Sequence, residues 1–194
     1  HVRQVTTAAG FGLVKAAKAR GVNITCGITP AHFMLSDLAT IDFRTFARLS
    51  PPLRSEADRE AARAAIGEGL VDVIASGHDP RGPEDKRQPF ADAQPGMAGA
   101  ETLLAMTLNL VRDGVIDTER AFELLAKNPA ALLGVPAGAL SVGLEADIAL
   151  VDPEAPWIVD RAKMEATADN TPFDRQGAQG RVRALIKGGV MIDR

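Results

Sequence analysis

The chain has 194 residues, of which 46% are hydrophobic and 24% charged, and its 22 basic and 25 acidic side chains give a formal net charge of −3. This composition is typical of soluble globular proteins and excludes intrinsic disorder, which requires low hydrophobicity and a large net charge. The small negative charge argues against nucleic-acid binding, and no apolar run approaches the ~18 residues of a membrane span. The single cysteine, Cys26, cannot form an internal disulfide, which favours a cytoplasmic location. Because the chain begins with His1, we expect it to be part of a longer protein.

The first part of the chain alternates helix and strand patterns. Thr6 and Thr7 can cap a first helix, and Ser55 with Asp58 resembles a capping box at the start of a second one. Short apolar runs bounded by Pro or Gly indicate buried strands. The expected elements are a helix to residue 20, strands over 23–28 and 46–49, a helix over 56–69 and a strand over 70–75. Strands that alternate with helices in this way predict βα units and a parallel sheet.

The second part begins with a long loop, residues 77–99, which is rich in Pro, Gly and charge. Loops of this length inside a compact domain are usually functional or mobile. Helical periodicity returns over 101–113, 118–127 and 129–133, and short β-type runs follow at 147–151, 157–159 and 182–186. We therefore predict an α/β protein with a barrel-like part over residues 1–135 and a small β-rich part over residues 136–194.

The three histidines, His1, His32 and His78, lie at or just after the ends of expected strands. In parallel α/β barrels the active site is built at the C-terminal ends of the strands. A three-histidine metal site is therefore compatible with their positions. Their spacing matches no short ligand motif such as HExxH, however, and from position alone a surface or capping role is favoured for each. There is no glycine-rich phosphate loop after a strand, and Cys26 is expected to be a core residue.

Five ordered motifs carry a more specific resemblance. The chain opens with HVRQVTTAAGFGLVKAAKARGVNIT; ITPAHFML then resembles the pattern TPHHLLL, and LSPPLRSEADREA resembles NPPLRSExDREA. The segment DVIASGHDPRGPEDKRQPFADAQPGMAGAETLL resembles DxIATDHAPHTxEEKxxPFxxAxxGxxGxETxL. The last motif comprises GLEADIALVDPEAPWIVD, NTPFD and GRVRALIKGGVMI. Together they make the chain similar to the C-terminal half of dihydroorotases, which are cyclic amidohydrolases.

This resemblance implies the C-terminal portion of a TIM-like (β/α)8 barrel followed by part of a small β-sandwich. It also implies one or two Zn²⁺ ions, whose bound hydroxide attacks the cyclic amide of dihydroorotate. Metal-bound water is needed because bulk water is a poor nucleophile at neutral pH. The resemblance places the protein in pyrimidine biosynthesis, in the cytoplasm, with a small-molecule substrate and an oligomeric state.

Compared with the family's motifs one by one, the chain lacks several of the residues that the resemblance implies for the site. His1 matches one of the family's metal-binding histidines. Gly77 stands where the family has the catalytic Asp that contacts the metal and relays the proton. Ser50 stands where a substrate-holding Asn belongs, and Arg81 replaces a His that contacts the substrate carboxylate. Pro95–Gly96 occupies the backbone pair that cups the pyrimidine ring, with its glycine kept.

Two hypotheses follow from these substitutions. Glycine carries no proton-transferring group, and loss of a general acid–base typically costs about 10²- to 10⁴-fold in rate. In the first hypothesis the protein is a zinc-dependent dihydroorotase or related cyclic amidohydrolase, and Asp79, two residues beyond Gly77, rescues the site. In the second it is a non-catalytic homologue that assembles with aspartate transcarbamoylase. Three altered site positions in an otherwise well-kept scaffold favour the second hypothesis.

Overall fold

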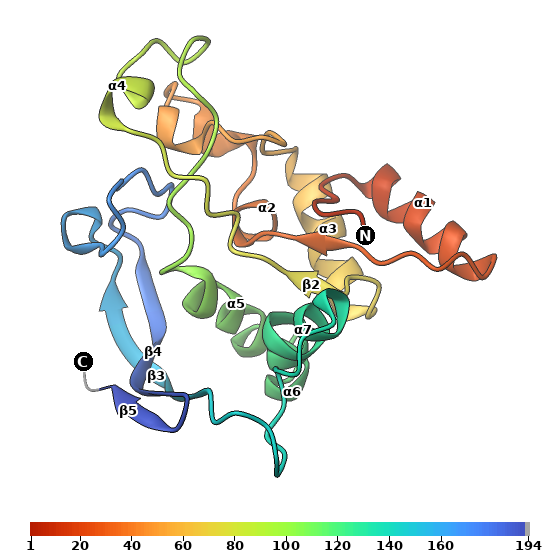
Figure 1. Ribbon diagram of the computed structural model, residues 1–194. Coiled ribbons are helices and arrows are strands. Elements are labelled where there is room, and N and C mark those ends of the chain that lie inside the picture. Colours follow the sequence, from red (N-terminus) through yellow and green to blue (C-terminus); the bar gives the residue numbers. More distant parts are fainter. Residues whose placement is uncertain (193–194) are drawn as a thin grey trace.

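A computed structural model gives the structure of the chain and describes residues 1–192 (Figure 1). The strands form two sheets: β1 (Gly27–Ile28) with β2 (Val73–Ile74), and β3 (Ile148–Ile158) with β4 (Gly177–Lys187) and β5 (Val190–Ile192). The α-helices are α1 (Ala8–Ala19), α2 (Pro30–Met34), α3 (Glu56–Gly67), α4 (Pro83–Lys86), α5 (Leu103–Arg112), α6 (Thr118–Phe122) and α7 (Asn128–Leu133). A π-helical turn, Glu123–Lys127, joins α6 to α7, and 3-10 turns lie at Asp37–Thr40, Thr45–Ala47 and Arg161–Lys163.

The predicted starts of the first two long helices, at Thr7 and Ser55, are confirmed. Both depend on hydrogen bonds between residues close together in the sequence. The Thr7 hydroxyl accepts a hydrogen bond from the backbone N–H of Gly10 at 3.1 Å and so caps α1. The Ser55 hydroxyl accepts one from the N–H of Asp58 at 3.3 Å and caps α3. Each bond satisfies one of the four N–H groups that a helix leaves free at its start.

The parallel sheet is also confirmed, although its strands are shorter than the apolar runs predicted. Gly27 pairs with Val73 and Ile28 with Ile74, and Val2 makes an isolated parallel bridge to Cys26. A strand extends only as far as a partner strand pairs with it, so the length of an apolar run does not fix the length of the strand.

The strand predicted over residues 46–49 is wrong. This segment contains the 3-10 turn Thr45–Ala47, and its backbone bonds to a side chain and a loop instead of a strand. The carbonyl of Arg48 accepts from the N–H of Gly96 at 3.0 Å and from the Lys86 ammonium at 3.3 Å. Ala47 and Leu49 are buried, which explains why the segment is apolar without being a strand.

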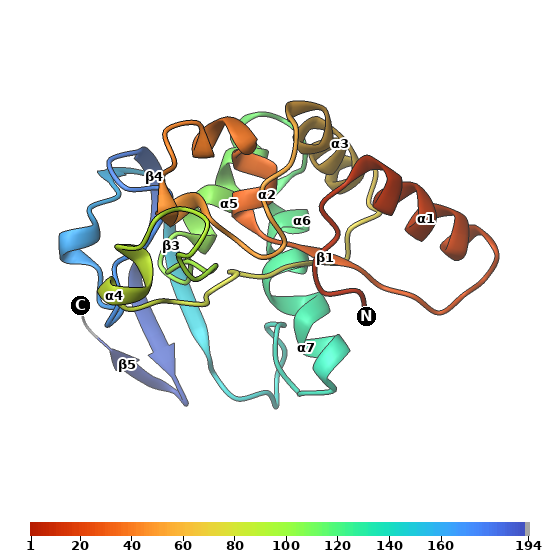
Figure 2. The same ribbon diagram turned by 90° about the horizontal axis from the view of Figure 1, so that it is seen from above.

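The antiparallel β3–β4–β5 sheet lies on the side of the molecule opposite to α1, with α5 between them (Figures 1 and 2). The runs predicted separately at 147–151 and 157–159 form the single strand β3, because register shifts after Leu150 and Asp152 absorb the intervening residues. Gly180 lies where α5 packs on β4. Its φ of +105° is rarely adopted by residues with a side chain, and a Cβ there would lie 2.5 Å from Leu108 Cδ1, which would have to shift.

Two hydrophobic clusters hold these parts together. The first joins α1, α3, α5 and the parallel strands, and includes Phe11, Val14, Ile28, Ile66, Ile74 and Leu110. The second joins the end of the 77–99 loop and α5 to the C-terminal sheet, and includes Met97, Met106, Val159, Phe173 and Ala178. The second cluster therefore crosses the domain boundary predicted after residue 135, which stays a prediction. Across residues 1–192, the helices fall short of the length and apolar character needed to cross a lipid bilayer.

Candidate functional site

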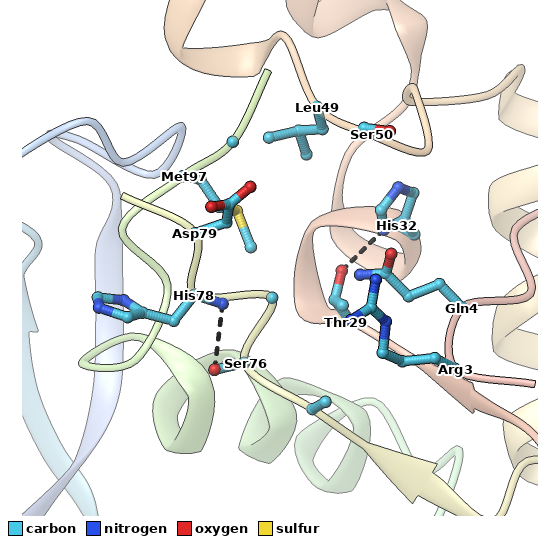
Figure 3. Close-up of a pocket in the computed structure, with 13 residues that line it drawn as sticks. Arg3, Gln4, Thr29, His32, Leu49, Ser50, Ser76, His78, Asp79 and Met97 are labelled. Atoms are coloured by element: carbon cyan, nitrogen blue, oxygen red, sulfur yellow. Dashed lines mark hydrogen bonds between the residues drawn. The ribbon is translucent and has the colours of Figure 1, made fainter. Parts of the chain in front are cut away.

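A cavity of about 460 Å³ lies beyond the C-terminal ends of β1 and β2 (Figure 3). It is lined by Arg3, Gln4, Thr29, His32, Leu49, Ser50, residues 75–79, Gly96 and Met97. This is the edge at which α/β proteins build their binding sites, because the loops that follow parallel strands converge there. The cavity brings together four of the predicted positions, Ser50, Gly77, Asp79 and Gly96.

His32 supports the wall of the cavity instead of offering a free nitrogen to it. Its Nε2 donates to the carbonyl of Pro51 at 3.0 Å, and its Nδ1 accepts from the Thr29 hydroxyl at 2.7 Å. Burial lowers the pKa of His32, which favours the neutral ring, and a neutral ring is compatible with these two bonds. Both ring nitrogens of His32 are therefore engaged, one with Thr29 and the other with the loop at Pro51.

His1 and His78 do not join His32. The ring of His78 points away from the cavity, and its Nδ1 lies 3.3 Å from the backbone nitrogens of both Gly99 and Ala100, just before α5 (Figure 3). His1 Nδ1 is 2.8 Å from the Thr25 hydroxyl, and His1 does not line the cavity. The three-histidine site considered from the sequence is therefore not formed.

A zinc centre needs three or four clustered N, S or O ligands. Within residues 1–192, no group of three His, Cys, Asp or Glu side chains could hold a metal ion. The described residues therefore do not form a zinc site by themselves, and the role of His1 as a single contributed ligand stays a prediction.

Gly77 lies in a backbone and packing environment that suits glycine. Its φ is +63°, in the left-handed region that residues with a side chain rarely adopt. A Cβ built there would lie 3.0 Å from both Met97 Cε and Thr29 Cγ2, closer than ordinary van der Waals contact. The methyl groups of Met97 and Thr29 thus crowd the place where a side chain at position 77 would begin.

Asp79, the predicted rescue residue, lines the cavity but is engaged in an ion pair. The Asp79 carboxylate and the His32 ring approach the cavity from opposite sides (Figure 3). Oδ2 of Asp79 accepts from Nη2 of Arg81 at 2.7 Å, and Nε of Arg81 donates to the carbonyl of Pro95 at 2.8 Å. Arg81, which is anchored on the carbonyl of Pro95, therefore holds the Asp79 carboxylate in place.

Gly96 is required by a close approach of two backbones. A Cβ on Gly96, at φ +135°, would lie 2.3 Å from the carbonyl oxygen of Asp79. The buried side chain of Asn170 joins the same two segments: its Oδ1 accepts from the N–H of Arg81 at 3.0 Å, and its Nδ2 donates to the carbonyl of Gly96 at 3.0 Å.

The position of Asn170 was missed from the sequence, although the NTPFD motif that contains it was recognised. Arg3 and Gln4 were missed as well, and both line the cavity beside Thr29 and His32 (Figure 3). Both belong to the first motif and lie close to His1, and this position is the sequence feature that could have indicated their place at the cavity. The substrate-binding roles predicted for Ser50, Arg81 and Pro95–Gly96 stay predictions.

A buried lysine fixes the loop behind this site. The Lys86 ammonium donates to the carbonyls of Gln94 at 2.7 Å, Thr45 at 3.1 Å and Arg48 at 3.3 Å. Burial, followed by the positive charges of Arg81 and Arg48, lowers the pKa of Lys86 to about 8. Lys86 thus ties residues 45–48 to the far end of the 77–99 loop.

Comparison with known proteins identifies the fold. Residues 5–192 match the amidohydrolase family. The chain is 39% identical over 192 residues to a dihydroorotase of Geobacter sp. (strain M21), covering 98% of this chain and 45% of that protein. It is 39% identical over 189 residues to a dihydroorotase-like protein of Pseudomonas aeruginosa, covering 97% and 44%. The chain thus spans less than half the length of these relatives.

Among solved structures, L-hydantoinase (dihydropyrimidinase) from Arthrobacter aurescens superimposes with a TM-score of 0.94 at 26% identity, covering all of this chain and 44% of that one. The predicted fold class is therefore confirmed: the α/β chain corresponds to the C-terminal portion of an amidohydrolase barrel followed by part of its β-sandwich. The match over residues 5–192 shows that the chain belongs to the amidohydrolase family, in which its relatives include dihydroorotases and dihydroorotase-like proteins.

Proposed function

We propose that the protein is a dihydroorotase-like amidohydrolase that does not hydrolyse dihydroorotate. The observation that carries this proposal is the surroundings of Gly77. The position lacks a carboxylate, and Met97 and Thr29 crowd the space from which one would extend. An amide nitrogen leaves badly unless it is protonated, so a site without the proton-relaying acid loses about 10²- to 10⁴-fold in rate.

The remaining function we propose is structural support of aspartate transcarbamoylase in pyrimidine biosynthesis, in the cytoplasm. The ordered scaffold around an altered site supports this role, because Asn170 holds the loop beside the cavity in place while position 77 lacks the acid. An oligomer that includes the transcarbamoylase is the assembly we expect. The cavity would then bind a small molecule without converting it.

The test of inactivity uses the protein expressed from its complete natural gene and supplied with Zn²⁺. Hydrolysis of dihydroorotate and condensation of carbamoyl aspartate are both measured against a buffer blank and against an active dihydroorotase. We expect no turnover above the blank in either direction. Reproducible turnover above the blank in either direction would contradict the proposal.

The alternative is an active zinc-dependent cyclic amidohydrolase in which Asp79 supplies the acid. It deserves a test because Asp79 is the one carboxylate among the described residues that line the cavity. Any measured hydrolysis should then be abolished by Asp79→Ala. It should be unaffected by Asp85→Ala, which removes an exposed aspartate of the same loop that does not line the cavity. If the main proposal is correct, the protein has no hydrolytic activity, and Asp79→Ala leaves the result of the assay unchanged.

The partner role is tested separately. Affinity-tagged protein is used to capture aspartate transcarbamoylase from the same organism, and transcarbamoylase activity is measured with and without it. We expect co-purification in a fixed ratio and partner activity that falls when this protein is withheld. Full transcarbamoylase activity in the absence of this protein would contradict the supporting role and leave the test of inactivity unaffected.

A further inference from the structure

The cavity beyond β1 and β2 is the place where the resemblance to dihydroorotases implies a bound metal ion. A zinc ion takes three or four nitrogen, sulfur or carboxylate ligands, each about 2.0–2.3 Å away. The position and the existing bonds of each side chain around the cavity therefore decide whether this part of the protein fits such an ion.

His1 lies too far along the sheet to reach an ion in the cavity. Val2 forms a parallel bridge with Cys26. His1 is therefore level with Thr25, before the start of β1. The cavity begins at Thr29, beyond the other end of that strand. The four residues from Thr25 to Thr29 span about 13 Å if the chain is extended.

The surroundings of the His1 ring agree with this position. Its Nδ1 lies 2.8 Å from the Thr25 hydroxyl. Its Nε2 lies against β1, since a Cβ built on Gly27 would be 3.2 Å from it. Gly27 is not part of the lining of the cavity. The His1 ring thus packs on the sheet itself and not at the edge where the cavity lies.

The polar side chains that do line the cavity make a poor set of zinc ligands. Both nitrogens of His32 are engaged, as described above. The Asp79 carboxylate is paired with Arg81 at 2.7 Å, and this positive charge weakens its attraction for a second cation. Gln4 offers an amide oxygen, a ligand more typical of calcium sites than of zinc sites.

The cavity also contains a positive charge of its own. Arg3 lines it, on the side opposite to Asp79 (Figure 3). The ion pairs formed among residues 1–192 do not include Arg3. A guanidinium stays protonated at all pH values that proteins tolerate, and it repels a divalent cation twice as strongly as a monovalent one at the same distance.

We propose that this part of the protein supplies no metal ligand and that Arg3 disfavours divalent metal ions in the cavity. A permanent guanidinium charge then stands where the resemblance implies zinc. The inference goes beyond the proposed function and concerns metal binding alone. A protein that held a metal ion through His1 and still failed to hydrolyse dihydroorotate would contradict this inference and leave the proposed function intact.

The first test measures metal binding by protein expressed from its complete natural gene and stripped with a chelator. Co²⁺, a spectroscopic substitute for Zn²⁺, is added, and bound metal is followed by visible absorption and by elemental analysis after desalting. His1→Ala, His78→Ala and Asp79→Ala should bind the same amount as the wild type with the same spectrum. Asp85→Ala, which changes an exposed residue outside the cavity, is the control. Loss of half or more of the bound metal in any of the first three variants, but not in Asp85→Ala, would overturn the proposal.

The second test concerns the charge of Arg3. Arg3→Gln should raise the affinity of the complete protein for Co²⁺ by about threefold or more, measured by competition with a chelator, because the repulsion is removed. Arg20→Gln is the matched control, since it removes the same charge from an exposed position at the end of α1. Denaturant unfolding verifies that both variants are folded. Unchanged or lower affinity in Arg3→Gln, or an equal rise in Arg20→Gln, would overturn the role of Arg3.

Discussion

At position 77, restoring the family's aspartate would require Met97 Cε and Thr29 Cγ2 to move, since each lies 3.0 Å from the site of a Cβ. We therefore predict that Gly77→Asp restores no hydrolysis and lowers the free energy of unfolding by about 1–3 kcal/mol. Denaturant unfolding and the dihydroorotate assay measure the two effects. If the variant hydrolyses dihydroorotate, the crowding around Gly77 is not what silences the site.

A matched control separates the backbone effect from the crowding. Gly114 has φ +69°, close to the +63° of Gly77, but nothing lies within 4 Å of its Cβ position. Gly114→Asp should therefore lower the free energy of unfolding only by the cost of placing an aspartate in the left-handed backbone conformation. The difference between the two variants measures the contacts of Met97 and Thr29, and we expect Gly77→Asp to be the more destabilised.

The buried ring of His32 predicts a pH dependence of stability. Burial lowers its pKa in the folded protein, so below about pH 6.5 the unfolded chain binds a proton that the folded protein does not. The free energy of unfolding should therefore fall as the pH is lowered through this range. Proton binding at His32 would also reverse the bond with Thr29, because Nδ1 would then donate to the hydroxyl oxygen.

This dependence is measured by denaturant unfolding at several pH values. His32→Gln should be less stable at pH 7, and its free energy of unfolding should depend less on pH below pH 6.5 than that of the wild type. His78→Gln is the control, because that ring is exposed. A slope that is unchanged in His32→Gln but reduced in His78→Gln would show that His78, and not His32, is the titrating group.

At the scale of elements, the outcome of sequence reasoning depended on how far apart the interacting residues are. The helix caps at Thr7 and Ser55 were predictable because each bond spans three residues. The apolar segment 46–49 was not, because its backbone bonds to Lys86 and Gly96, which are tens of residues away. Alternating apolar residues indicate burial, but they do not say whether a strand, a side chain or a loop supplies the partner.

The loop that carries Asp79 and Arg81 depends on Asn170, and this predicts a local effect. Asn170→Ala leaves the N–H of Arg81 and the carbonyl of Gly96 without their side-chain partner. We expect the free energy of unfolding to fall by about 1–3 kcal/mol, the cost of leaving buried polar groups unsatisfied. Hydrogen exchange should quicken in residues 79–97 and stay unchanged in α1; uniform acceleration throughout the chain would contradict a local clamp.

At the scale of the whole molecule, the ordered motifs predicted the α/β fold, while the site could be predicted only in part. Ser50, Gly77, Asp79 and Gly96 line one cavity, while the roles expected for them stay predictions. The motifs did not place Arg3, whose neighbours in space come from other strands and loops. A motif records which residue types recur, whereas the lining of a cavity depends on how distant segments pack.

The parallel sheet predicts the behaviour of residues 1–194 expressed alone. Within the described residues the parallel sheet consists of β1 and β2, extended only by the short backbone contacts of Val2 and Val5 with Gly27, and two-stranded sheets are marginally stable in water. Open strand edges also favour association between chains. We expect this polypeptide to elute as mixed oligomers in size-exclusion chromatography, with weakly protected amides in β1 and β2. The protein from the complete gene is the control, and a monomer with one sharp unfolding transition would contradict the prediction.

The two bonds of Asn170 also bear on how this family can be recombined. The residue lies 89 positions after Arg81, on the far side of the predicted domain boundary, yet it fixes the loop at the mouth of the cavity. A chimaera that receives residues 136–194 from a relative would inherit the cavity's shape only if the graft brings an amide side chain to position 170. The C-terminal segment thus helps to hold in place the loop that lines the candidate site.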